Sequence, residues 1–172
     1  MCNRSVFVGG CCVALLATGG VLQAASMSGA DKAFMNAAAR IEMTEAHQGQ
    51  MAQNQASRAD VKDLGKSIAQ DYRQSYDQLF GLAAKTGVAI PRGIDAARNP
   101  AIAHLKSMQG VRFDQSYAKD EIAANRRAIA VFKREADHGQ DTDVKAYASH
   151  MLPVMQRDLQ RAQACLKPSK RA

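Results

Sequence analysis

Hydrophobic residues recur at alternating spacings of three and four along most of this chain. This period places side chains on one face of an α-helix and predicts four long amphipathic helices, at about residues 29–55, 57–87, 113–138 and 141–165. The predicted core-facing positions are Phe34, Ala38, Ile41, Glu45, Gln48, Ala52 and Gln55 in the first helix; Val61, Gly65, Ile68, Tyr72, Ser75, Leu79 and Leu82 in the second; Ala118, Ile122, Asn125, Ile129, Phe132 and Ala136 in the third; and Val144, Ala148, Met151, Met155, Asp158 and Ala162 in the fourth.

Capping and breaking residues mark the predicted helix ends. Ser57 is a favourable N-cap for the second helix, and Gly87 is a typical C-terminal stop. Asn99 is followed by a proline, the pattern of an N-cap and a first-turn proline, which predicts a short helix from there to Gln109. Asp141 is the expected N-cap of the fourth helix.

The connections between the helices predict their arrangement. The first and second helices are joined tightly, as are the third and fourth, whereas a long segment separates the second from the third. The sequence therefore predicts an all-α fold over residues 29–166, a ferritin-like four-helix bundle of two antiparallel hairpins joined by a long crossover with a short extra helix. The alternative is an up-and-down bundle with one long loop. Asp-Val-Lys occurs at residues 60–62 and again at 143–145, which hints at a duplication.

The N-terminal segment predicts export. Arg4 precedes an apolar run that ends at Leu22, and small residues follow at Ala24 and Ala25. This is the pattern of a secretory signal peptide, so we expect residues 1–25 to be removed. An uncleaved membrane anchor is the alternative. Export across the inner membrane predicts a protein of the periplasm or one associated with the outer membrane.

Export also changes the cysteine count. Cys2, Cys11 and Cys12 lie in the predicted signal peptide, which leaves Cys165 alone in the mature chain. A single cysteine cannot form an internal disulfide. We expect Cys165 to be a small apolar residue at the end of a helix, and a disulfide-linked dimer is the alternative.

Composition supports helices and limits the partners. Aromatic residues make up 5% of the chain and Trp is absent, which argues against a β-sandwich. Without Arg4, 22 Lys and Arg face 16 Asp and Glu, a net charge of +6. Basic and acidic residues are interspersed, apart from a basic tail at residues 167–172. We therefore expect a protein or envelope-surface partner, weak binding to anionic surfaces and no specific binding of nucleic acid.

Motifs for common enzyme chemistries are absent from the sequence. It contains neither a P-loop nor Gly-x-Gly-x-x-Gly, and Ser149 and His150 are adjacent, which turns them about 100° apart on a helix. Glu135 and His138 form one Glu-x-x-His, which is half of a ferritin-like di-metal signature. However, Gly139 ends the helix directly afterwards and no second Glu-x-x-His occurs. We therefore predict no enzyme activity and no cofactor, and expect His138 to interact with the helix dipole.

Polar residues interrupt each predicted core face: Glu45 and Gln48 in the first helix, then Tyr72, Asn125 and Asp158. Burying such a group without a hydrogen bond costs about 1–3 kcal/mol. A neutral network is one solution, with the Tyr72 hydroxyl bonded to Asp158 or Glu45 and with Asn125 bridging. Partial exposure at a bundle end is a second. The third is a cation site of Glu45 and Asp158 with oxygen donors from Asn125 and Gln48, which would suit Ca²⁺, Mg²⁺ or Mn²⁺.

Three stretches carry a resemblance to a known family: MTEAHQGQMA at residues 43–52, DVKDLGKSIAQDYRQSYDQLFGLAAKTGVAIP at 60–91, and FDQSYAKDEIAANRRAIAVFKREADHGQDTDVKAYASHMLP at 113–153. Here the chain resembles the bacterial proteins of domain of unknown function 4142, often described as predicted outer-membrane proteins. The resemblance implies a signal-bearing, ferritin-like helical bundle of the cell envelope without a settled activity. Some members have been connected with stress responses.

The chain departs from the family at positions that bear on metal binding. Family members often have histidine where this chain has Tyr72, Asn125 and Asp158, and a Glu-x-Glu pattern where it has Glu45-Ala46-His47. These differences favour a non-enzymatic envelope protein that acts by protein or surface contact. The alternative is a ferritin-like metal-binding or oxidase protein with a degenerate carboxylate site in the bundle core.

Overall fold

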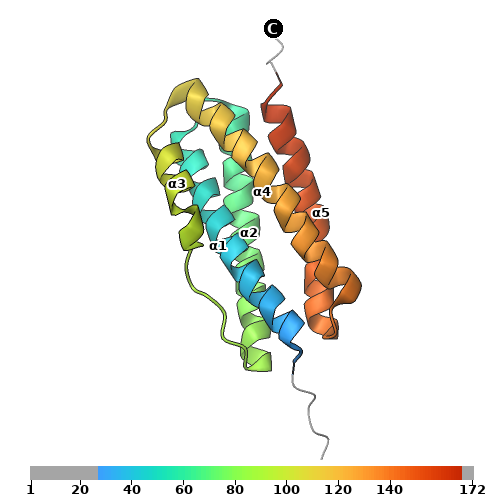
Figure 1. Cartoon of the computed structure of the whole chain (residues 1–172). Coiled ribbons are helices and arrows are strands. Elements are labelled where there is room, and N and C mark those ends of the chain that lie inside the picture. Colours follow the sequence, from blue (N-terminus) through green and yellow to red (C-terminus); the bar gives the residue numbers. More distant parts are fainter. Residues whose placement is uncertain (1–26, 168–172) are drawn as a thin grey trace, which may run out of the picture.

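The computed structural model describes residues 27–167, all of which lie in helices or in the connections between them (Figure 1). The α-helices are α1 (Gly29–Gln55), α2 (Ala59–Thr86), α3 (Asn99–Lys106), α4 (Gly110–His138) and α5 (Thr142–Cys165), and a 3-10 turn, η1 (Ala96–Arg98), precedes α3. The predicted all-helical class is therefore confirmed. The predicted signal peptide, residues 1–25, and residues 168–172 of the predicted basic tail lie outside the described part.

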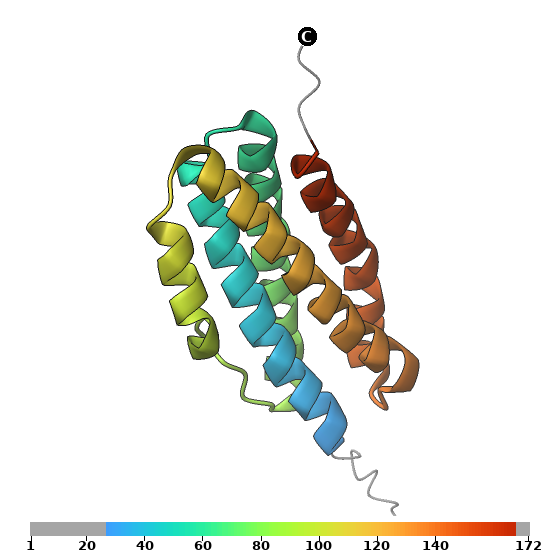
Figure 2. The same ribbon diagram turned by 45° about the horizontal axis from the view of Figure 1, so that its top comes forward.

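The four long helices lie side by side in two pairs (Figures 1 and 2). α1 packs along α2, α4 packs along α5, and the pairs meet where α1 contacts α4 and α2 contacts α5. The two helices of each pair run in opposite directions, and α2 and α4 run in the same direction. Among the described helices, none has both the length and the apolar character required to span a membrane.

Several predicted helix ends coincide with the observed ones. α1 has the predicted bounds, and α2 ends at Gly87, whose φ of 68° is a left-handed conformation that glycine adopts without strain. Asp141 caps α5, because its carboxylate accepts hydrogen bonds from the backbone N–H groups of Asp143 at 2.9 Å and Val144 at 3.0 Å.

Three local predictions are wrong. Asn99 is not the N-cap of α3 but its first residue, and the N-cap is Arg98. Ser57 is not the N-cap of α2, since the helix begins after Arg58 and the Ser57 hydroxyl donates to Asp114 on α4 instead. The short helix ends at Lys106 and not at Gln109. Its last turn is held by α1, where the side-chain amide of Gln55 donates to the Lys106 carbonyl at 3.2 Å.

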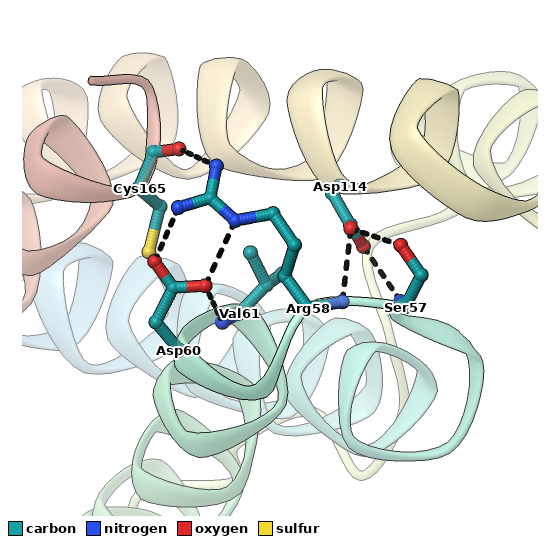
Figure 3. A network of polar contacts seen from close by, with 6 residues as sticks. All are labelled: Ser57, Arg58, Asp60, Val61, Asp114 and Cys165. Carbon is teal, nitrogen blue, oxygen red and sulfur yellow. Dashed lines mark hydrogen bonds and ion pairs between the residues drawn. The ribbon is translucent and has the colours of Figure 1, made fainter. Parts of the chain in front are cut away.

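One polar cluster holds the turn between α1 and α2 against the other helix pair (Figure 3). Buried Asp114 accepts hydrogen bonds from the backbone N–H groups of Ser57 at 2.9 Å and Arg58 at 3.0 Å. The Arg58 guanidinium donates to the Cys165 carbonyl at 2.8 Å and pairs with Asp60. The Cys165 thiol is free and buried, and burial raises its pKa to about 11. The turn therefore contacts both α4 and α5.

A second buried aspartate makes the equivalent contact at the other end of the bundle. Asp31, in the first turn of α1, accepts hydrogen bonds from the backbone N–H groups of Gln140 at 3.0 Å and Asp141 at 3.1 Å. The corresponding residues of the two clusters are always 83 positions apart: 31 and 114, 57 and 140, 58 and 141. Each helix pair thus caps the turn of the other.

α1 and α2 approach each other through two glycines. A Cβ atom added at Gly65 would lie 2.7 Å from the Gly49 carbonyl oxygen, and one at Gly49 would lie 2.6 Å from the Gly65 carbonyl oxygen. Because the opposing atoms belong to the backbone, a side chain cannot be accommodated by a change of rotamer. These glycines therefore set the spacing of the first helix pair.

We predict that Gly65→Ala lowers the free energy of unfolding by about 2–3 kcal/mol, because the methyl group must push two helices apart. Urea denaturation followed by circular dichroism measures the change. Gly81→Ala is the matched control: it lies in the same helix with no atom within 4 Å of the added Cβ. This control should raise stability by about 0.5–1 kcal/mol, the usual gain from Gly to Ala in a helix. A Gly65→Ala variant as stable as the control would contradict the close packing.

Candidate functional site

The bundle interior contains many acidic side chains. The buried ones are Asp31, Glu42, Glu45, Asp114, Glu121, Glu135 and Asp158. Within residues 27–167, no Lys, Arg or His is buried to the same degree. An ionised carboxylate is costly to bury without a countercharge, so these groups must be protonated, hydrogen-bonded or both.

Glu42 links three helices. It lies in α1, and one of its oxygens accepts hydrogen bonds from the Ser75 hydroxyl of α2 at 2.7 Å and from the Tyr147 hydroxyl of α5. The two hydroxyl oxygens are 2.8 Å apart. Burial raises the pKa of Glu42 to about 8, against its two hydrogen bonds, which lower it. Glu42 is therefore largely neutral at pH 7.

Glu45 and Glu121 form a carboxyl pair between α1 and α4. Their buried carboxyl groups lie close enough to shift each other's pKa, and two adjacent carboxylates repel each other, which favours a proton on one of them. Burial raises the pKa of Glu45 to about 7 and that of Glu121 well above its ordinary range. The pair therefore holds a proton between α1 and α4.

Tyr72 and Asn125 extend this pair toward α2. The Tyr72 hydroxyl donates to the Asn125 side-chain oxygen at 3.1 Å, and not to Asp158 or Glu45. The Asn125 amide donates to the Glu121 carbonyl at 3.1 Å and to its carboxyl at 3.4 Å. A continuous series of polar groups thus runs from α2 through α4 to α1.

The remaining predicted site residues lie in different surroundings. Asp158 is fully buried, and one of its oxygens accepts from the Arg157 guanidinium at 3.0 Å, while the other has no partner. Gln48 is buried in α1, where its oxygen accepts from Arg98 of the crossover at 3.4 Å and its nitrogen has no partner. Glu45 and Gln48 therefore face the crossover, while Asp158 is held by its own neighbour in α5.

The donor set fits a ferritin-like di-metal centre poorly. In the described part of the chain, no three His, Cys, Asp or Glu side chains gather in a way that could hold a metal ion. All four histidines, His47, His104, His138 and His150, are exposed. Glu135 does not pair with His138. Its carboxyl lies beside that of Asp31, and burial together with this neighbouring acid raises its pKa to about 7.

Sequence reasoning missed Glu42 and Glu121 because it placed the adjacent isoleucines in the core. The structure buries Glu42 and Glu121 almost completely, at 0% and 1% exposure, and leaves Ile41 and Ile122 only half-buried. A signal was present, since Glu42 lies three residues before Glu45 and Glu121 lies four before Asn125. Such spacings share a helix face.

Comparison with solved structures shows the same fold in bacterial proteins. A fragment of a DUF305 protein from Deinococcus radiodurans superposes with a TM-score of 0.72 at 11% identity, over 80% of this chain and 95% of that one. A bacterioferritin-related protein from Bacteroides fragilis, described as a dodecameric thioferritin, gives a TM-score of 0.61 at 21% identity, over 80% and 83%. CopM in a silver-bound form gives 0.64 at 12% identity, over 78% and 93%. Identities this low show the fold alone.

Sequence comparison assigns the family. No curated protein sequence is detectably similar to this chain. The family model for the domain of unknown function DUF4142, however, matches residues 17–165, which include all five helices and both glutamates of the buried carboxyl pair. This chain therefore belongs to the DUF4142 family.

Proposed function

We propose that this protein is a non-enzymatic helical bundle of the bacterial cell envelope, exported by its N-terminal segment and acting through contacts with other envelope molecules, under stress. We further propose that its helices have the ferritin-like arrangement, in which a long crossover joins two antiparallel hairpins. The contacts of α1 with α4 and of α2 with α5 support this arrangement. So does the resemblance to a bacterioferritin-related fold.

One observation carries the non-enzymatic proposal: apart from Asp158, which pairs with Arg157, the interior acids lie against backbone N–H groups, neutral side chains or one another, while every imidazole is exposed. Glu42 is bonded to two hydroxyl groups, and the carboxyl group of Glu45 lies beside that of Glu121. Such an interior stabilises the bundle without an ion. A redox di-iron centre uses imidazole as well as carboxylate ligands on its helices, and this core contains none.

A ferritin-like metal-binding or oxidase protein is the alternative. It is favoured by one buried oxygen each of Glu45 and Asp158 that has no hydrogen-bond donor, since a carboxylate oxygen of this kind can coordinate a cation. CopM, a protein of similar fold, has been crystallised with silver. In this chain the candidate donors are Glu45, Asp158, Asn125 and Gln48. Their oxygen atoms would suit Ca²⁺, Mg²⁺ or Mn²⁺ better than a redox iron pair.

Elemental analysis of the mature protein, purified from its native compartment, separates these functions. We predict iron and manganese contents far below one equivalent per chain, unchanged by Glu45→Ala combined with Asp158→Ala. Asp77→Ala, on the exposed face of α2, serves as the control for loss of a carboxylate. Stoichiometric metal that disappears in the double variant and persists in the control would establish the alternative.

Export predicts a defined mature N-terminus. In a cell fractionation, we expect the protein in the periplasmic or outer-membrane fraction, beginning at Ala25 or Ser26 by N-terminal sequencing. Deletion of residues 2–25 should retain the chain in the cytoplasm. Recovery of the intact N-terminus in the inner-membrane fraction would show an uncleaved anchor instead.

The buried acids also make stability depend on pH. An exposed Glu has an ordinary pKa of 4.5, whereas the folded-state pKa is about 8 for Glu42 and about 7 for Glu45 and Glu135. Between these values the folded state binds more protons than the unfolded state, so the free energy of unfolding falls as pH rises. The contribution is complete below about pH 4.5 and is lost as pH passes through 7–8.

We predict that the free energy of unfolding decreases by roughly 3–5 kcal/mol between pH 5 and pH 8.5, as expected for several carboxyl groups with raised pKa values. Glu42→Gln, which keeps the shape and removes the titration, should flatten this slope by about half. Gly81→Ala alters stability without changing any titratable group and should keep the wild-type slope. Urea titrations at several pH values measure these quantities, and a stability that rises over this interval would refute the proton-sharing interior.

A further inference from the structure

A small hollow opens beside the carboxyl pair, between α1, α4 and the crossover. Its volume is about 130 Å³, enough for several water molecules or one small polyatomic ion. α4 contributes small side chains there, among them Ala124 and Ala128, which leave the space open. Buried Glu45 of α1 also lines the hollow and forms its inner end.

Three arginines from three different elements line this hollow: Arg40 of α1, Arg98 of η1 and Arg127 of α4. In residues 27–167, the ion pairs involve Arg58, Lys133 and Arg157 as the cations and none of these three. The one side-chain hydrogen bond among them is the long contact from Arg98 to Gln48, at 3.4 Å. The hollow thus presents guanidinium groups whose hydrogen-bonding capacity is largely unused.

The crossover is fixed over α1 by a specific bond. The Thr44 hydroxyl accepts from the backbone N–H of Asp95 at 3.0 Å, and the Asp95 carboxylate in turn accepts from the N–H of Ala97 at 3.1 Å. These contacts hold the turn that carries Arg98. The arginines are therefore brought together by tertiary contacts that exist without a ligand.

The charge around the hollow favours an anion. Arg40, Arg98 and Arg127 bring three positive charges, whereas Asp95 is the one other charged group besides Glu45, whose pKa burial raises to about 7. Gln48, bonded to Arg98, also has an unpartnered buried amide nitrogen, which is a donor. A metal cation would be repelled by the guanidinium groups, and an oxyanion would be attracted by them.

We propose that this hollow is a binding site for an oxyanion group, the phosphate or carboxylate end of a small ligand, held chiefly by Arg98 and Arg127 with Arg40 at the rim. Guanidinium groups bind both kinds of oxyanion through paired N–H donors. A protonated Glu45 at the inner end accommodates the ligand's negative charge, so binding weakens as Glu45 loses its proton.

Isothermal titration of the mature chain at low ionic strength, with inorganic phosphate in one arm and acetate in the other, tests this site. Saturable binding of at least one anion is expected, stronger at pH 6 than at pH 8. The phosphate and acetate arms distinguish a phosphate-bearing from a carboxylate-bearing ligand. Arg127→Gln should weaken the binding by about tenfold or more, as for loss of a charge-assisted pair of hydrogen bonds.

Arg126→Gln is the matched control, because Arg126 is the preceding, exposed residue of the same helix, outside the hollow, and the change in net charge is identical. It should alter the affinity by less than about twofold, the size of a distant surface-charge effect. Ala124→Leu fills the hollow without changing any charge and should also abolish binding. Circular dichroism and melting temperatures without ligand verify that each variant is folded.

Three results would overturn the proposal. Equal weakening by Arg126→Gln and Arg127→Gln would show general attraction to a basic surface. Absence of saturable binding by either anion in the folded wild-type chain would show that the arginines serve only to offset the charge of Glu45. Binding that survives Ala124→Leu would likewise place the anion elsewhere.

Discussion

The structure depends on one constraint: a carboxyl group in an apolar interior has to give up its charge or find donors. Glu42 accepts hydrogen bonds from Ser75 of α2 and Tyr147 of α5, and Glu45 lies beside the protonated carboxyl group of Glu121 on α4. Tyr72 of α2 is connected to that partner through Asn125. The bonds of Glu42 with Ser75 and Tyr147, and of Tyr72 with Asn125, join different helices. These polar groups therefore fix the relative heights of all four, which an interior of interchangeable apolar side chains specifies less well.

At each end of the bundle, a buried aspartate of one helix pair accepts two backbone hydrogen bonds from the turn of the other pair. The capping aspartates, Asp31 and Asp114, are separated by 83 positions, and the repeats of Asp-Val-Lys at residues 60–62 and 143–145 have this separation as well. Val61 and Val144 of these repeats are both fully buried. The common spacing supports the duplication that the repeated tripeptide hints at.

The same separation also relates parts of the polar interior. Glu42 corresponds to Asn125, and Ser75 corresponds to Asp158. Glu42 accepts a hydrogen bond from Ser75. The equivalent residues are not bonded to each other: Asn125 accepts from Tyr72, and Asp158 accepts from Arg157. The equivalent positions therefore remain polar in both pairs while their bonding has diverged.

The sequence predicts the fold well where burial follows hydrophobicity. The core faces of α2 and α5 are almost wholly as predicted, because their large apolar side chains recur at the helical period. In α1 and α4 the prediction is wrong at Glu42 and Glu121. The pattern of hydrophobic positions predicts that acidic residues are exposed, whereas these two are buried in protonated form, since burial raises their pKa values. Ser57 fails for a related reason: its hydroxyl bonds to an aspartate distant in sequence.

The arginine-lined hollow could not be predicted from the sequence. Arg40, Arg98 and Arg127 come from three separate segments, and Arg98 is positioned through the bond from the Asp95 N–H to Thr44. Each is an ordinary basic residue when read locally. They line one hollow only because the segment between α2 and α4 lies against α1 and α4 in the folded chain.

The hollow also bears on whether the acidic interior attracts a metal. A cation that approaches Glu45 through this opening meets three guanidinium groups and one other acid, Asp95, so the net charge around the opening is positive and repels it. The arginines balance negative charge from outside, and the proton held by Glu45 and Glu121 reduces it inside, so both disfavour a cation at this opening.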